Sequence, residues 1–198
     1  MPEITQNDLW ESAWKLLHRG QSDPKCAFST PVVATVTADG EPRTRTIVLR
    51  KVLKVSGELL GYTDRRSNKA DDLTNGSRVM SWTFWDPKKK IQLNCSGPTD
   101  WLPENLAKER FDQLPKHSRK SYATLAAPGR PQKEATDGLP KDWNQRDTRE
   151  TDYAAGHFGI LSTRITRAEV LQLSRDGHRR LLAERGEAEE WTFTWLVP

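Results

Sequence analysis

The pattern of hydrophobic and polar residues has helical spacing near the start of the chain and changes to short strand-like runs after it. Between residues 7 and 19 the apolar side chains recur every three or four positions, which predicts one amphipathic helix. They are Leu9, Trp10, Ala13, Trp14, Leu16 and Leu17. Gly20 follows the last of them and is predicted to end this helix.

From residue 32 onward, short β-branched runs alternate with turn residues, the pattern of antiparallel strands. Strands are predicted at residues 32–37, 43–52, 59–63, 79–85 and 91–95, at 158–173 as one or two strands, and in a closing pair that ends at 191–197. The strands predominate, so the fold class is mainly β: an antiparallel sheet or barrel with added helices. The strands do not alternate with long helices and no G-x-G-x-x-G motif is present, which argues against a Rossmann fold.

Two short helices complete the regular elements. Ser67 is placed to start a helix that runs to Leu73, and Asn75-Gly76 is placed to end it. Pro103 is placed to start another helix, which Pro115 stops.

The whole chain of 198 residues is expected to form one domain. Residues 127–149 interrupt it, being rich in proline, glycine and charge with Trp143 as their only large aromatic residue. A segment this long without regular structure is typical of a lid, a binding loop or a disordered insert.

Charge and composition narrow the function classes. Lys and Arg number 31 against 27 Asp and Glu, and the net charge is only +4, with the two signs interspersed. A nucleic-acid-binding protein usually gathers its basic residues on one face, so an anionic small molecule fits at least as well. Cys26 and Cys95 form no metal-binding spacing and favour a reducing compartment. No secretion signal and no apolar run of membrane-spanning length is apparent, so a cytoplasmic protein is expected, without a membrane partner.

The densest candidate cluster is the basic segment from Arg43 to Lys51. It can be an exposed edge strand whose charges prevent aggregation, or an anion site in which guanidinium groups hold a phosphate. In one regular strand Arg45 and Arg50 would point to opposite faces. They could meet one ligand only through a bulge, a strong twist at a strand end, or a second subunit.

A second cluster lies where a strand leads into a helix, at Tyr62-Thr63 and then Arg65-Arg66-Ser67-Asn68-Lys69. The N-terminus of a helix is receptive to phosphate, Ser67 can cap it, and Lys69 adds a full charge. The alternative is a capped surface helix with solvated basic residues.

Two later features could face a ligand as well. An inward-pointing Gln92 could offer its amide to the polar edge of a heterocycle, and His178-Arg179-Arg180 follows the last turn region. The sequence shows no catalytic triad, HExxH motif, paired carboxylates or nucleophilic cysteine. Chemistry carried by a bound cofactor fits this scarcity.

Taken in order, these motifs resemble the pyridoxamine 5'-phosphate oxidase family. The matching residues are Ala34-Thr35-Val36, Asp39-Gly40, Pro42-x-x-Arg45-x-x-Val48-Leu49-Arg50, Tyr62-Thr63, Arg66-Ser67-Asn68-Lys69-Ala70, Gln92, Gly97, His178-x-Arg180 and Trp195-Leu196-Val197-Pro198. The resemblance covers most of residues 32–101 and resumes over about 157–198.

The resemblance implies an antiparallel Greek-key split β-barrel with peripheral helices, working as a homodimer with FMN in the cleft between the subunits. The implied cofactor-binding residues are Arg45, Thr46, Ile47, Val48, Leu49, Arg50, Tyr62, Thr63, Ser67, Asn68, Lys69, Gln92 and Arg180. His178 would orient the substrate. The implied activity is hydride transfer between a small molecule and bound FMN.

The substrate side departs from the family. Where authentic oxidases clamp the substrate phosphate with Tyr, Arg and Ser, this chain has Phe111, Pro115, Ser118 and Arg119. Two other hypotheses stay open: a flavin-binding or sensing protein without turnover, and a basic β-barrel that binds nucleic acid through tryptophan stacking.

Overall fold

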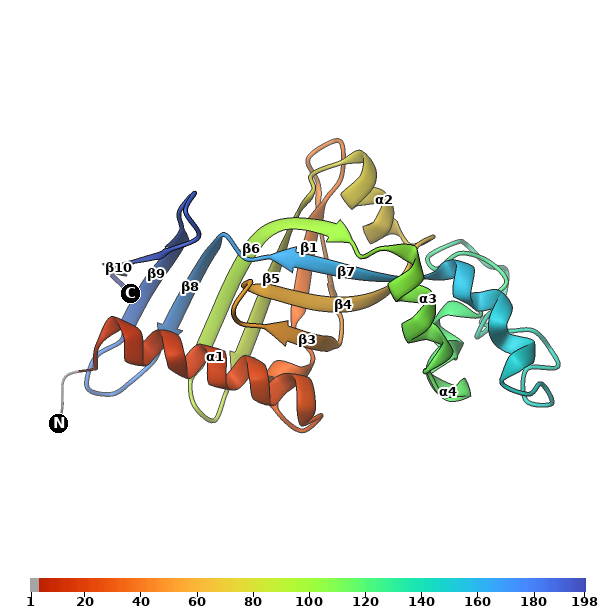
Figure 1. Cartoon of the computed structure of the whole chain (residues 1–198), viewed down its shortest axis with the longest axis horizontal. Coiled ribbons are helices and arrows are strands. Elements are labelled where there is room, and N and C mark those ends of the chain that lie inside the picture. Colours follow the sequence, from red (N-terminus) through yellow and green to blue (C-terminus); the bar gives the residue numbers. More distant parts are fainter. Residues whose placement is uncertain (1–3) are drawn as a thin grey trace.

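The computed structural model describes residues 4–198, so part of the segment searched for a secretion signal lies outside the described residues. The chain forms two antiparallel sheets joined through one shared strand, with helices along one face and at one end (Figure 1). The strands are β1 (Val32–Val36), β2 (Pro42–Thr46), β3 (Leu49–Leu53), β4 (Glu58–Asp64), β5 (Val79–Asp86), β6 (Ile91–Trp101), β7 (Phe158–Arg164), β8 (Arg167–Gln172), β9 (Arg179–Arg185) and β10 (Trp191–Leu196). The α-helices are α1 (Gln6–Ser22), α2 (Asn68–Asn75), α3 (Glu104–Asp112) and α4 (Lys116–Arg119), and the 3-10 helices are η1 (Ala27–Ser29), η2 (Lys120–Tyr122) and η3 (Arg149–His157).

The first sheet has the strand order β10-β9-β8-β6-β5-β1-β2, and the second consists of β3, β4, β7 and the end of β6. Every strand pair is antiparallel. The predicted mainly β architecture with peripheral helices is confirmed.

Strand β6 belongs to both sheets. Up to Ser96 it pairs with β8, and from Thr99 it pairs with β7 instead. Gly97 lies at this change of partner, against the backbone of Arg164 at the end of β7. A side chain at residue 97 would overlap that backbone, so glycine allows the two sheets to meet here.

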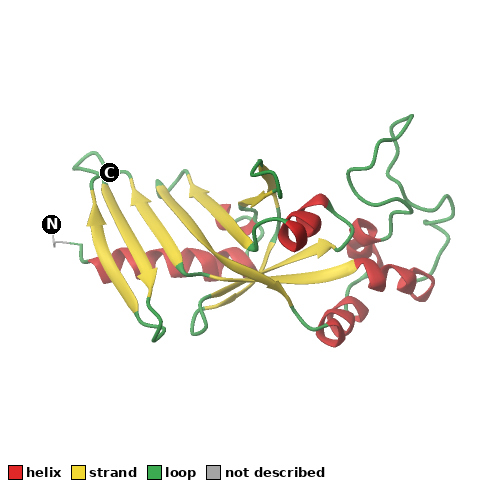
Figure 2. Ribbon diagram, turned by 90° about the horizontal axis from the view of Figure 1, so that it is seen from above, coloured by secondary structure: helices red, strands yellow, loops and turns green. Residues whose placement is uncertain are grey.

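Helix α1 closes one face of the first sheet. The apolar face predicted from the sequence is buried, and Trp10 packs against Trp191 and Phe193 of β10 at ring-centroid distances of 4.9 and 5.7 Å. Figure 2 shows α1 crossing behind β8, β9 and β10, while their near face carries no helix.

Three local predictions were wrong. Gly20 does not end α1, which continues to Ser22; it lies instead against the backbone of Phe28, where a side chain would clash. Residues 43–52 form two strands, β2 and β3, that lie in different sheets. Ser67 occupies the N-cap position of α2, but its hydroxyl makes no capping hydrogen bond.

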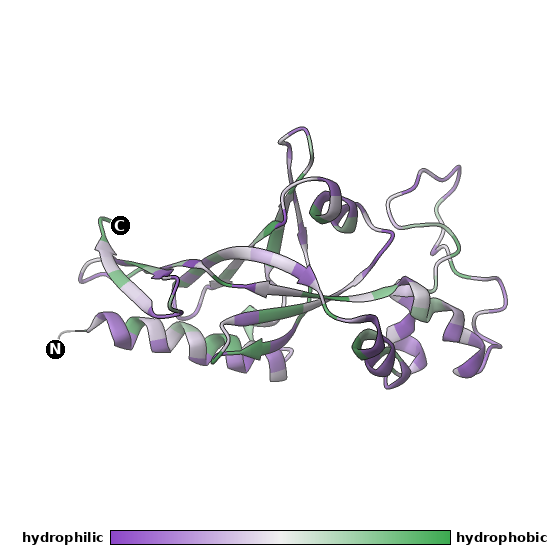
Figure 3. Cartoon of the chain, turned by 45° about the horizontal axis from the view of Figure 1, so that its top comes forward, coloured by the Kyte–Doolittle hydropathy of each residue, from purple (hydrophilic) through white to green (hydrophobic). Residues whose placement is uncertain are grey.

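The long segment 127–149 is irregular, as predicted, and largely hydrophilic (Figure 3). It is anchored by Trp143, which is buried in a second apolar cluster with Phe111, Tyr122 and Phe158. This cluster lies on the far side of the second sheet from the main core, beneath α3, η2 and η3. The anchoring argues against a disordered insert.

Among the described residues, no helix is both long enough and apolar enough to cross a membrane.

We expect Gly97→Ala to lower the free energy of unfolding by roughly 3 kcal/mol or to prevent folding, because the new methyl group would overlap backbone that cannot move independently of both sheets. Chemical denaturation monitored by tryptophan fluorescence measures the change. Gly156→Ala is the control, since a side chain there has no heavy atom within 4 Å. Equal stability of the two variants would contradict the role given to Gly97.

Candidate functional site

The basic segment changes direction twice between Arg45 and Arg50. Strand β2 ends at Thr46, β3 begins at Leu49, and the pairing of β3 with β4 shifts between Leu49 and Lys51, which makes Arg50 the extra residue of a β-bulge. The parity of a single strand therefore does not apply. Arg45 and Arg50 lie in different sheets and contact different residues.

Arg45 belongs to a network built around a buried carboxylate. Arg43 and Arg45 share the core-facing side of β2 with Thr35 of β1. Asp72 of α2 is only 2% exposed; its Oδ1 accepts from Arg43 at 2.9 Å and its Oδ2 accepts from the Thr35 hydroxyl at 2.6 Å. Arg45 donates to the Thr35 hydroxyl at 2.6 Å and lies 3.6 Å from the Asp72 carboxylate. The guanidinium of Arg45 is thereby held on the same side as α2.

Lys69 forms the second half of this cationic site. Its ammonium group donates to the hydroxyls of Thr63 and Ser67 at 2.5 and 3.2 Å. Within the part of the chain that the structure describes, no carboxylate pairs with Lys69 at ion-pair distance. Burial, together with the charge of Arg45, lowers the pKa of Lys69 to about 8, and the charge of Asp64 partly opposes this shift. We call Arg45, Thr63, Ser67 and Lys69 the cradle.

The entrance to α2 forms a polar hollow beside the cradle. A cavity of about 470 Å³ is lined by Arg43, Arg65, Arg66, Ser67, Asn68, Ala70, Asp71, Thr74, Asn75 and Arg130. Asn68 is exposed here, and its amide lies beside Gly129 of the long loop. Arg66 is held by both carboxylate oxygens of Asp64 and donates to the carbonyl of Thr124, which fixes the start of that loop near the cavity.

Arg50 lies in a different cluster, on the opposite side of β4. Successive residues of a strand point to opposite faces, so Tyr62 faces away from the cradle residue Thr63. The Arg50 guanidinium lies 4.9 Å from the centre of the Tyr62 ring, and Arg110 of α3 donates to the Tyr62 hydroxyl at 2.6 Å. The carboxylates of the described residues pair with neither arginine.

The remaining predicted residues of the basic segment line the path between the two clusters. Thr46 and Val48 are exposed, Ile47 is half-buried, and Leu49 is buried in the core. The side chain of Leu49 therefore packs the core, and only its backbone can approach a ligand. Ile47 also contacts Gly61, where a side chain would come within 2.9 Å of it.

Gln92 and Arg180 lie on the face of the first sheet that α1 leaves uncovered. Their strand neighbours Ile91, Leu93 and Leu181 are in the core, so Gln92 and Arg180 point to the outer face. Leu171 stands between them, directly opposite both residues in the sheet. Arg180 donates to Glu169 at 2.9 Å, which lowers the pKa of that carboxyl group.

His178 is exposed in the turn before β9, where its Nδ1 accepts from the backbone N–H of Ser174 at 3.2 Å. Four strands separate β9 from β2 in the sheet. The chain thus brings Arg45, Thr63, Ser67 and Lys69 together but leaves His178, Arg180 and Gln92 elsewhere.

Arg119, one of the residues found where authentic oxidases clamp the substrate phosphate, has a structural role in this chain. It is 2% exposed, and its donors are used by the carbonyls of Asp112, Leu114 and Thr148, the Thr151 hydroxyl and the Asp152 carboxylate. It also stacks on Phe111 at 4.5 Å. The burial of its guanidinium among these contacts keeps Arg119 away from a substrate phosphate.

Sequence reasoning missed Asp72 and Arg110. Asp72 could have been found from its spacing of three residues from Lys69, which places both on one side of a helix. Arg110 gives no such signal, since its contact with Tyr62 joins residues 48 positions apart.

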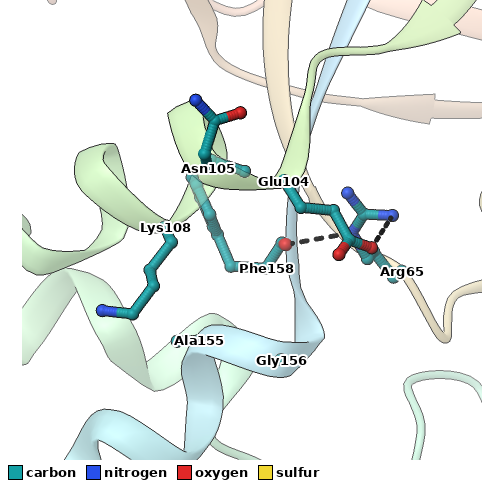
Figure 4. A pocket seen from close by; sticks show the side chains of 8 residues that line it. Arg65, Glu104, Asn105, Lys108, Ala155, Gly156 and Phe158 are labelled. Atoms are coloured by element: carbon teal, nitrogen blue, oxygen red, sulfur yellow. Dashed lines mark hydrogen bonds and ion pairs between the residues drawn. The ribbon is translucent and has the colours of Figure 1, made fainter.

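A separate cavity of about 400 Å³ lies between α3 and η3, over Phe158 and Ala107 (Figure 4). Arg65 borders it, donating to the carbonyl of Phe158 at 3.2 Å and stacking on Trp101 at 4.7 Å. Of the residues in the predicted clusters, Arg65 alone lines this cavity, and none of the cradle residues does.

The residues present fit a phosphate-bearing cofactor. A half-buried ammonium group with only hydroxyl partners, beside a guanidinium held in place, is a site that an anion completes. Over residues 4–198 the structure shows no group of three or more His, Cys, Asp or Glu residues that could hold a metal ion.

Comparisons with known proteins agree with this chemistry. A family model, described as the FMN-binding domain of pyridoxamine 5'-phosphate oxidase, matches residues 9–103. The pyridoxine/pyridoxamine 5'-phosphate oxidase of Leptospira interrogans is 30% identical over 171 residues, covering 84% of this chain and 77% of that protein.

Solved structures confirm the split-barrel fold. A pyridoxamine 5'-phosphate oxidase-related, FMN-binding protein from Nostoc punctiforme superposes with a TM-score of 0.77 at 20% identity, over 95% of this chain and 96% of that one. PhzG from Burkholderia lata gives a TM-score of 0.67 at 19% identity, over 100% of this chain and 94% of that one.

We expect the affinity for FMN to fall as the pH rises above 8. Lys69 is charged below its pKa of about 8 and neutral above it, so the phosphate loses a cationic partner as the pH increases. The dissociation constant should rise by up to about tenfold per pH unit between pH 8 and the higher pKa that Lys69 acquires beside a bound phosphate. Fluorescence titration of FMN from pH 6.5 to 10 measures this slope. Lys69→Met should bind more weakly and lose the slope; a slope that persists in this variant would assign the titration to another group.

Proposed function

Because the chain belongs to the pyridoxamine 5'-phosphate oxidase family of FMN-binding proteins, we propose that it is an FMN-dependent oxidoreductase acting on a small anionic molecule. The observation that carries the proposal is the cradle, in which Lys69 is half-buried with hydroxyl partners and no carboxylate. A dianionic 5'-phosphate supplies the missing charge there.

Within the cradle, Lys69 and Arg45 would bind the phosphate while the Thr63 and Ser67 hydroxyls keep Lys69 in place. The segment from Thr46 to Val48, exposed at both of these residues, leads from this site toward Arg50, and the rest of the cofactor would follow it. FMN, when bound, supplies the capacity to accept a hydride and pass electrons to an acceptor. The protein contributes binding, orientation and charge.

Arg50 and Arg110 would orient the substrate. Both guanidiniums lie within 6 Å of the Tyr62 ring, and no carboxylate of residues 4–198 pairs with them. Two unpaired cations beside one aromatic ring suit a planar molecule that carries an acidic group.

The name of the Leptospira interrogans relative gives pyridoxine or pyridoxamine 5'-phosphate as its substrate. This chain offers Arg110 and Arg50 for an anionic group, while Arg119 is buried and bonded to groups of the fold. We therefore assign the substrate class as a small anion and not pyridoxine phosphate in particular.

The proposal includes a homodimer with FMN between the subunits. Gln92 and Arg180 lie on the outer face of the first sheet, whereas the cradle lies on the core-facing side near α2, so one chain does not bring them to one ligand. That outer face also carries Trp85, which is 42% exposed, and the Asn94 carbonyl oxygen, which is buried without a hydrogen-bond partner. A second copy covering this face would supply Gln92 and Arg180 to the cradle of the first.

We expect anaerobic addition of a small anionic reductant substrate to bleach the flavin absorbance of the FMN-loaded protein. Arg110→Gln should lower kcat/KM for that substrate by about 10- to 100-fold, since a charge-assisted contact is worth roughly 1.5–3 kcal/mol, with FMN content unchanged. Stopped-flow spectroscopy over a panel of paired anionic and neutral compounds makes the measurement.

Lys120→Gln is the matched control, because Lys120 is exposed and its substitution removes one charge from the same end of the molecule. Stable FMN binding without reduction by any compound would favour a flavin-binding or sensing protein. Equal losses in Arg110→Gln and Lys120→Gln would remove Arg110 from the substrate site.

We expect Lys69→Gln and Arg180→Gln each to weaken FMN binding, and co-expression of the two variants to restore it in part. Random pairing gives half heterodimers, each with one site that has both native residues, so about a quarter of all sites should bind normally. Flavin content after purification of co-expressed, differently tagged chains measures the recovery. A monomer by light scattering in the presence of FMN, or no recovery on co-expression, would count against a shared site.

A further inference from the structure

Asp72 is a buried carboxylate that touches the cationic site from behind. It lies on α2, three residues beyond Lys69, and contacts Thr35 of β1 and Arg43 and Arg45 of β2. Its side chain is 2% exposed, so it cannot reach a ligand in the cavity at the entrance to α2.

The contacts form a closed set around the Thr35 hydroxyl. That hydroxyl donates to Asp72 at 2.6 Å and accepts from Arg45 at 2.6 Å, while Arg45 also lies 3.6 Å from the Asp72 carboxylate. An arginine has five N–H donors in a rigid fork, and these contacts use at most two of them. Arg45 is thus fixed in orientation with most of its donors still free.

The same carboxylate offsets repulsion. Arg43, Arg45 and Lys69 are gathered at one end of α2, and the charge of Arg45 already lowers the pKa of Lys69. Without an anion behind them, these cations would separate before any ligand arrived. A site whose cations are held in place beforehand binds its anion with less loss of conformational entropy.

We propose that Asp72 is a positioning residue that holds Arg45 ready for the 5'-phosphate of FMN, acting through the Thr35 hydroxyl and without touching the cofactor. The inference rests on the proposed function of the cradle. It assigns to a single carboxylate a share of the phosphate-dependent affinity for the cofactor, the share that Arg45 contributes.

The test compares FMN with riboflavin, which lacks the phosphate, in the full chain. The ratio of the two dissociation constants isolates the contribution of the phosphate. In Asp72→Asn, which keeps the size of the side chain and removes its charge, the ratio should fall about tenfold, the loss expected for one charge-assisted contact, with riboflavin affinity unchanged. In an Arg45→Gln background the same substitution should change the ratio less than about twofold.

Asp39→Asn is the matched control. Asp39 is exposed in the turn between β1 and β2, the strands that carry Thr35 and Arg45, and it does not line the cavity at the entrance to α2. The substitution removes the same charge from a solvated position, so it should change the ratio less than about twofold.

Three results would overturn the proposal: tighter FMN binding in Asp72→Asn, equal losses for FMN and riboflavin, or a full effect that persists without Arg45. If Asp72→Asn does not fold, Thr35→Val carries the test, because it removes the linking hydroxyl and leaves both charges in place; the ratio should then fall several-fold, and an unchanged ratio overturns the proposal. A wild-type protein that does not distinguish FMN from riboflavin would instead refute the phosphate cradle itself, whatever Asp72 does.

Discussion

The structure depends on one strand that pairs in two sheets. Strand β6 holds β5 and β8 along most of its length and β7 at its end, and it can turn from one sheet to the other because Gly97 leaves room for the Arg164 backbone. After the change of partner, the end of β6 pairs with β7, and β7 pairs with β4, so the second sheet continues from the end of β6. Trp82 of β5 then donates to Thr163 of β7 at 2.9 Å, and this buried bond ties the two sheets together. The strand-to-helix junction that carries the cradle follows directly from β4.

The charges around α2 show how a polar site is kept within an apolar framework. Asp64 holds Arg66, Asp72 holds Arg43 and Arg45, and both carboxylates are buried. Each of these buried carboxylates thus has an arginine partner, as a buried charge requires. Lys69 differs, because among the described residues its ammonium group donates hydrogen bonds to hydroxyl groups and to no carboxylate. The imbalance marks where a ligand's charge belongs.

The second sheet separates two kinds of binding surface. Thr63 faces the cradle and Tyr62 faces the arginines at residues 50 and 110, although the two residues are adjacent in β4. In the proposed assignment, the cofactor phosphate and the substrate anion bind on opposite sides of one strand and do not compete for the same cations. The uncovered outer face of the first sheet, with Gln92 and Arg180, adds a third surface that a single chain leaves apart from the others.

The sequence by itself determined the mainly antiparallel β fold, the amphipathic α1, the junction at Ser67 and the family to which the motifs belong. These follow from local periodicity, turn residues and motif order, which a linear chain displays directly. It did not determine that residues 43–52 form two strands with a bulge at Arg50. The break follows from strand pairing, because β2 pairs with β1 in the first sheet and β3 pairs with β4 in the second.

Only the tertiary structure decided which charges meet. The contacts of Asp72 with Arg45, and of Arg110 with Tyr62, join segments far apart in sequence and leave no periodic trace. Gly20 shows the same limit in the fold: a glycine that reads as a helix end is needed for the close approach of Phe28. Local patterns fix elements, whereas the packing of those elements decides which side chains become partners.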